Sequence, residues 1–143
     1  MKTDLSVMTQ HQLEIRGGNE IIARARAWTG KIADALGADR VAAADFMLAI
    51  SEACTNVVRY AYTDQPESYL ILTAEQIGER IIFRVRDFGV KFDPELLRSN
   101  DPGDELRVGG YGIYLMQQVM DEVRYITDHP VGTELILVRR RSG

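Results

Sequence analysis

Cysteine and histidine are scarce in this chain: one cysteine, Cys54, and two histidines occur among 143 residues. A single cysteine cannot form an internal disulfide, and so few thiol and imidazole groups cannot assemble a cysteine–histidine zinc site. No run of about 18 apolar residues is present, so no segment is expected to span a membrane. The N-terminus also lacks the apolar stretch of a secretion signal. These absences predict a cytoplasmic protein.

Positive charge is limited too, because 17 lysines and arginines face 21 acidic residues, giving a formal net charge of −4. Nucleic-acid binding needs a basic surface, so this class of function is disfavoured. The one basic run, Arg139 to Arg141, is typical of a solvated strand end. Apolar residues make up 45% and charged residues 27%, as in ordinary globular proteins. We expect a single domain over residues 1–143.

Hydrophobic periodicity predicts the order strand, helix, helix, strand, strand, helix, strand, strand. Strands are expected at 11–18, 68–77, 80–88, 122–129 and 132–141, helices at 19–36, 40–62 and 109–121, and a loop with one helical turn at 91–108. Asn19 and Asp39 are the expected N-caps of the first two helices. Consecutive helices and consecutive hairpins indicate an α+β two-layer sandwich, with helices on one face of an antiparallel or mixed sheet. They do not indicate a doubly wound nucleotide fold.

A carboxylate and an amide share one face of the second helix, in the stretch "SEACTNVVRYAY". Glu52 and Asn56 are four residues apart and therefore about 6 Å apart along the helix axis. Together they offer a proton acceptor and a neutral oxygen ligand, and Mg²⁺ prefers oxygen ligands together with water and phosphate. The solvated stripe of an amphipathic helix would produce the same pattern, so the pair does not decide the function by itself.

Two further stretches carry weaker signals. In "RVRDFGVKFDP", Asp87 ends a predicted strand and can accept a hydrogen bond from an exocyclic amine such as that of adenine, while Gly89 lets a flat base approach. A plain turn explains the same residues. In "RVGGYGIYLM", Gly109, Gly110 and Gly112 open an apolar helix, whose N-terminal N–H groups attract phosphate. A flexible turn is the alternative there.

The order of these stretches, followed by "GTELIL", resembles the N, G1 and G2 boxes of the Bergerat-type (GHKL) ATPase superfamily. "SEACTN", the "FDP" after the G1 glycine and "GGYGIYLM" followed by "MDEV" are most similar to its stand-alone bacterial branch, the anti-sigma factor serine/threonine kinases of the partner-switching type. The resemblance covers nearly the whole chain. It implies an α+β sandwich that binds ATP or ADP with Mg²⁺.

The resemblance also implies roles for particular residues. Glu52 would be the general base that takes the proton of the target serine, and Asn56 would hold Mg²⁺ between the phosphates. Asp87 would accept the adenine amino group, with Thr133 supporting it and a short lid at 93–108 covering the phosphates. The full set of implied nucleotide contacts is Asn56, Asp87, Gly89, Arg107, Gly110, Tyr111, Gly112 and Thr133.

Partners follow from the same resemblance. The protein would phosphorylate a STAS-domain anti-anti-sigma protein on serine or threonine and sequester a sigma factor or another output regulator, and a homodimer is possible. The net charge and the lack of a long apolar run predict no nucleic-acid or membrane partner. The alternative is a non-catalytic nucleotide-binding module that acts as a scaffold or activator. Tyr60 motivates that alternative, because family members often carry histidine there. The ATPase half of a histidine kinase is disfavoured, since a helical dimerisation segment with a phospho-accepting histidine is lacking.

Overall fold

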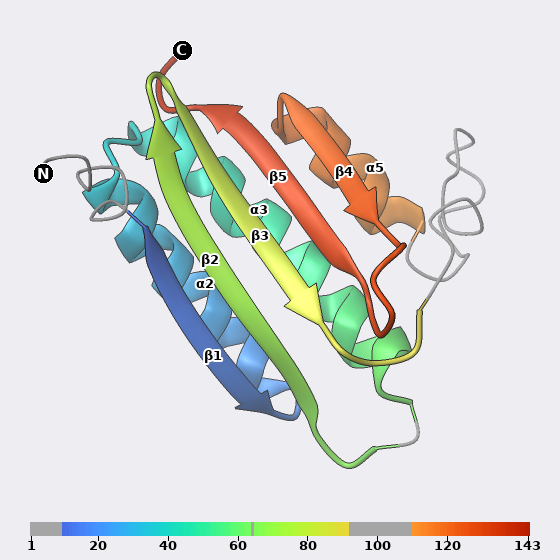
Figure 1. Cartoon of the computed structure of the whole chain (residues 1–143). Helices are drawn as coiled ribbons and strands as arrows, with labels where there is room; N and C mark the ends of the chain where they lie inside the picture. The colour runs from blue at the N-terminus through green and yellow to red at the C-terminus, as the bar shows by residue number, and fades with distance from the viewer. Residues whose placement is uncertain (1–9, 64, 92–109) are drawn as a thin grey trace, which may run out of the picture.

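An antiparallel sheet covered on one face by helices organises this protein (Figure 1). The computed structural model describes residues 10–63, 65–91 and 110–143. In chain order its elements are β1 (His11–Gly17), α2 (Glu20–Ala35), α3 (Arg40–Asn56), η2 (Val57–Ala61), β2 (Ser68–Ile77), β3 (Arg80–Asp87), α5 (Gly110–Val119), β4 (Glu122–Ile126) and β5 (Glu134–Arg140). The strand order is β1-β2-β3-β5-β4, and each neighbouring pair runs antiparallel. The predicted α+β sandwich is therefore confirmed, with an antiparallel rather than a mixed sheet.

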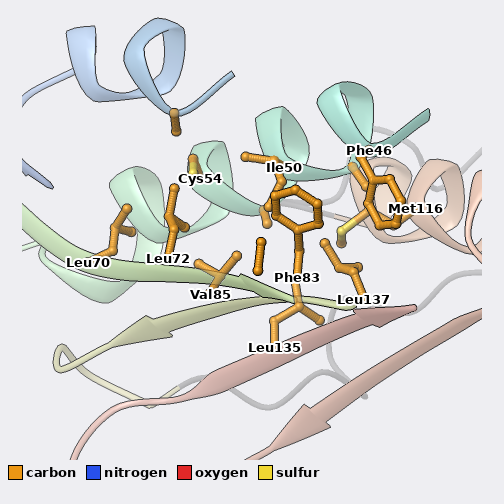
Figure 2. Packing of buried hydrophobic residues seen from close by; sticks show 14 of the residues in the cluster. Phe46, Ile50, Cys54, Leu70, Leu72, Phe83, Val85, Met116, Leu135 and Leu137 are labelled. Atoms are coloured by element: carbon orange, nitrogen blue, oxygen red, sulfur yellow. The ribbon is translucent and has the colours of Figure 1, made fainter. Parts of the chain in front are cut away.

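The core lies between the central strands and the helices (Figure 2). Alternate residues of β2 and β3 point towards the helices, which is why these strands alternate between buried and partly buried side chains. The ring of Phe83 lies 4.8 Å from that of Phe46 on α3 and 6.0 Å, edge to face, from that of Trp28 on α2. Such ring pairs contribute about 0.5–1.5 kcal/mol each beyond their buried area, so they hold both helices against the sheet.

The two predicted helix caps behave differently. Asp39 caps α3 as expected, because its Oδ1 accepts the N–H of Ala42 at 2.8 Å. The predicted Asn19 cap is wrong: its side chain makes no capping hydrogen bond, since its backbone is already helical, with φ −60° and ψ −24°. A capping side chain needs an extended backbone to reach back to the first turn. Glu20 accepts the N–H of Gly18 at 3.1 Å instead.

The helix predicted at 40–62 is divided in two. The α-helical hydrogen-bond pattern of α3 ends at Asn56, and η2 continues as one stretch of π-helix. The end of this segment is fixed by Tyr62, whose hydroxyl donates to the carbonyl of Tyr69 at 2.7 Å and accepts the N–H of Phe88 at 2.8 Å. Short π-helical segments often occur at functional sites, and this one directly follows a predicted site residue.

Helix α3 and η2 together are apolar enough to resemble a membrane span. By length and composition alone the helical segment 40–61 would qualify, because an 18-residue window within it has a mean hydropathy of 1.4. Its apolar side chains pack against the sheet and the neighbouring helices, where Ala42, Phe46, Ala49, Ile50, Ala53 and Cys54 are buried. A core position therefore accounts for the composition, and Cys54 is a small buried side chain as expected.

Candidate active site

Segments far apart in the sequence line one small cavity between α3 and the sheet. Its walls are Ala53, Asn56, Val57, Val85, Asp87, Tyr125, Thr133 and Leu135. Three predicted site residues, Asn56, Asp87 and Thr133, are thus brought together. The volume of the cavity is about 10 Å³, which is room for roughly one water molecule. Tyr125 joins these walls from β4, and no sequence pattern had marked it.

Asp87 places a buried carboxylate at the end of β3. It is 2% exposed, and its Oδ1 accepts the N–H of Gly89 at 3.0 Å. Burial raises the pKa of this carboxyl, while the backbone N–H groups of Gly89 and Thr133 oppose that rise. The N–H of Asp87 itself donates to the carbonyl of Thr133 at 2.9 Å. The carboxylate therefore has a fixed position and acceptor capacity left for a donor from a ligand.

Glycines allow two backbone segments to approach this carboxylate closely. A Cβ at Gly89 would overlap the carbonyl oxygen of Ala61, the same oxygen that accepts the N–H of Val90 at 2.7 Å. Gly132 has a φ of +75°, and a Cβ there would overlap the carbonyl oxygen of Asp87. Gly89 was expected to make room for a base, and it also makes room for the end of η2.

Two buried polar atoms in the walls of the cavity and one on η2 have no hydrogen-bond partner within the described residues. They are Asn56 Nδ2, Tyr60 Oη and Thr133 Oγ1. Asn56 is 4% exposed and Thr133 is 2% exposed. An unpaired buried polar group costs about 1–3 kcal/mol, so native structures rarely retain one without a reason. Because Asn56 and Thr133 share the cavity with Asp87, a polar ligand entering it would satisfy both.

Glu52 lies one turn before Asn56 and faces a different neighbour. A Cβ built on Gly112 would be 2.7 Å from Glu52 Oε1, so the first turn of α5 lies directly against this carboxylate. Glu52 is partly buried, burial raises its pKa, and the charge of Arg59 opposes the rise. A carboxyl group with a raised pKa therefore lies next to a helix N-terminus, which favours anions.

The remaining predicted contacts fall at the start of α5 or before it. Gly110 and Tyr111 are the first two residues of that helix. Arg107 and the predicted lid at 93–108 lie outside the described residues. Within the described part of the chain, no group of three or more histidine, cysteine, aspartate or glutamate side chains could hold a metal ion. Mg²⁺ does not require such a group, because it retains waters and binds phosphate oxygens.

Comparison with known proteins connects this geometry to a family. The histidine kinase-like ATPase domain family matches residues 18–139. The serine-protein kinase RsbW of Staphylococcus epidermidis is 32% identical over 138 residues, which cover 90% of this chain and 87% of the relative. The chain belongs to the RsbW family of serine-protein kinases. The RsbW of Bacillus cereus strain Q1 is 31% identical over 124 residues, covering 82% of this chain and 77% of that protein.

The RsbW-family chain also shares its fold with a more distant group. The nucleotide-free catalytic domain of the histidine kinase ThkA superimposes with a TM-score of 0.55 at 11% sequence identity, covering 92% of this chain and 99% of that one. At that identity the likeness concerns the fold alone. It agrees with the α+β sandwich and the layer of helices described above.

Proposed function

We propose that this protein is an ATP-dependent serine/threonine-protein kinase and anti-sigma factor, formed by a single cytoplasmic domain over residues 1–143. It phosphorylates a STAS-domain anti-anti-sigma protein and sequesters a sigma factor or another output regulator. One observation supports this most: Asn56, Asp87 and Thr133 line one cavity, while Glu52 on the same helix lies against Gly112. Membership of the RsbW family supports the same conclusion.

Recognition of the nucleotide base depends on the buried end of β3. The adenine amino group would donate to the Asp87 carboxylate, whose position is fixed by the N–H of Gly89. The Thr133 hydroxyl, which has no partner within the described residues, would take part in the same polar network. Satisfying these buried groups would return part of the free energy that their burial costs.

The phosphates would lie at the other end of the site, at the start of α5. The N–H groups at Gly110, Tyr111 and Gly112 would bind them, since a helix N-terminus attracts anions. Mg²⁺, when bound, would neutralise charge on the phosphates, and the Asn56 amide would be its protein ligand. Glu52 would accept the proton of the substrate hydroxyl as its oxygen bonds to the terminal phosphorus and ADP leaves. Its raised pKa suits a base that works near neutral pH.

The proposed function is tested by incubating the protein with Mg-ATP and a STAS-domain anti-anti-sigma protein. We expect the STAS protein to gain the mass of one phosphoryl group on a serine or threonine. Binding of ATP without any transfer would favour the alternative, a non-catalytic partner-switch module. Tyr60 is the observation behind that alternative, because its hydroxyl is buried without a partner within the described residues, where relatives often carry histidine.

Asn56→Ala is expected to weaken ADP binding in the presence of Mg²⁺ by about 10–100-fold, as the loss of groups at metal sites does. The loss should be smaller when Mg²⁺ is removed with a chelator, because the base contacts remain. Isothermal titration under both conditions measures the difference. Thr55→Ala is a matched control, since its hydroxyl bonds to the carbonyl of Ser51 within the same helix. An equal loss with and without Mg²⁺ would contradict the assignment of Asn56 as the metal ligand.

Arg59→Gln is expected to move the acid limb of the pH–rate profile to higher pH. The charge of Arg59 lowers the pKa of Glu52, so its removal leaves burial less opposed and the pKa rises further. Because Glu52 must be ionised to accept a proton, activity is then lost at a higher pH on acidification. The profile of kcat/KM measures this, with Arg124→Gln on an exposed strand position as the control. An unmoved limb would show that Glu52 ionisation does not limit the reaction.

A further inference from the structure

Tyr125 is the one cavity wall that comes from β4. The other walls belong to α3, η2, β3, β5 or the turn before β5. Burial raises the pKa of the Tyr125 hydroxyl. Its hydrogen bond with the Asn56 side chain lowers that pKa, and the nearby charge of Asp87 raises it. The two groups that we assign to the metal and to the adenine amino group are thus both neighbours of this ring.

The cavity is too small for the ligand that we propose for it. Its volume of about 10 Å³ leaves room for roughly one water molecule, and a purine is several times larger than a water. One of the walls must therefore move before a base can enter. Asn56, Val85 and Leu135 are poor candidates, because they are buried in the core on α3 or on strands paired at both sides.

Tyr125 is better placed to move than any other wall. Strand β4 is the last strand in the order β1-β2-β3-β5-β4 and spans five residues, from Glu122 to Ile126. Its only pairing in the described structure is with β5. Figure 1 shows β4 at the edge of the sheet, beside α5. Tyr125 as a whole residue is only partly buried, whereas Asn56, Val85 and Leu135 are buried.

We propose that Tyr125 determines which bases the site accepts: in the nucleotide-free protein its ring fills part of the base subsite, and when a purine enters the ring moves aside only far enough to line the subsite beside the base. This inference rests on the proposed nucleotide binding. The ring and the nucleotide then compete for the same space and for the same neighbours, Asn56 and Asp87. The measured affinity equals the intrinsic affinity multiplied by the fraction of molecules in which the ring has moved aside, so a small fraction lowers it. Removing the ring should raise the affinity and enlarge the subsite.

The test measures binding of ADP and of N⁶-benzyl-ADP by isothermal titration. Tyr125→Val is expected to bind ADP about 3–10-fold more tightly than the wild type, because the competing ring is gone. It is also expected to bind the benzyl analogue at least tenfold more tightly than the wild type does, since the benzyl ring occupies the space of the missing phenol. Tyr125→Phe retains the ring and should still exclude the analogue. Arg124→Val, on the opposite face of β4 with a 62% exposed side chain, is the matched control.

The outcomes separate this inference from the proposed function. If the wild type binds ADP but Tyr125→Val shows neither tighter ADP binding nor a gain in analogue binding, the ring does not occupy the base subsite and the inference is overturned. If no protein in the series binds ADP, the proposed nucleotide binding itself fails. Circular dichroism checks the fold of each variant, and Tyr125→Leu, which keeps more apolar volume, replaces Tyr125→Val if the valine variant unfolds.

Discussion

Asp87→Asn should weaken ADP and ATP binding by about 10–100-fold, the loss that corresponds to a hydrogen bond to a charged group of about 1.5–3 kcal/mol. The backbone N–H groups of Gly89 and Thr133 face this side chain. They would hold the amide oxygen of an asparagine, which turns its NH₂ group towards the adenine amino group. Two donors would then face each other at the point where recognition depends on an acceptor.

The same substitution should leave the nucleotide-free fold as stable as the wild type, or more stable, at neutral pH. Burial raises the pKa of Asp87 above its ordinary value of 3.8, so the native state holds this proton more tightly than the unfolded state. Wild-type stability therefore falls as the pH rises through the ordinary and then the native pKa, and this loss is complete above the native pKa. Asparagine carries no charge, so the variant does not lose stability in this way as the pH rises.

Thermal unfolding measured across pH, together with titration of ADP, checks both parts of this prediction. The difference in melting temperature between Asp87→Asn and the wild type should shrink as the pH falls below the ordinary pKa of the carboxyl. If the affinity for ADP is unchanged, the base is held elsewhere. If the variant is less stable than the wild type at neutral pH, burying the charge of Asp87 does not lower the stability of the wild-type fold.

Glu52→Gln is expected to slow phosphoryl transfer by about 10²–10⁴-fold, the usual contribution of general base catalysis. Glutamine fills the same space against Gly112 but cannot accept the proton of the substrate hydroxyl. ATP affinity should stay close to that of the wild type, because Glu52 is not one of the walls of the base cavity.

Single-turnover transfer to the STAS-domain protein and titration of ATP measure the two quantities separately. Ser51→Ala is a suitable control, since that hydroxyl donates to the carbonyl of Met47 within α3. Unchanged transfer by Glu52→Gln would remove Glu52 as the base. Loss of ATP binding and transfer together would instead indicate a structural role against α5.

Local patterns predicted most of the fold because they depend on neighbouring residues. The alternation at 68–77 and 80–88 with a glycine between them predicts the β2–β3 hairpin, and Gly78 indeed has a φ of 61°. The end of α3 at Asn56 could not be predicted in this way, since no proline or glycine marks it. The π-helical segment that follows Asn56 is held at its far end by contacts with distant residues, Ala61 with Val90 and Tyr62 with Phe88.

In the candidate site, too, local spacing predicted some features, whereas others depend on contacts between distant parts of the chain. The spacing of Glu52 and Asn56 predicts a shared helix face, and the structure adds that their neighbours differ, with α5 beside one and the cavity beside the other. Tyr125 was missed because an aromatic residue in a strand is unremarkable. Its importance comes from the edge position of β4 in the sheet, which depends on the whole topology.

A crystal structure of the protein with ADP and Mg²⁺ tests most directly whether α3, β3 and α5 surround one nucleotide. We expect the adenine amino group within about 3 Å of an Asp87 carboxylate oxygen, the metal on the Asn56 amide, and the phosphates beside the start of α5 near Glu52. A nucleotide bound with its base away from Asp87, or with its phosphates away from both Asn56 and Glu52, would contradict this arrangement.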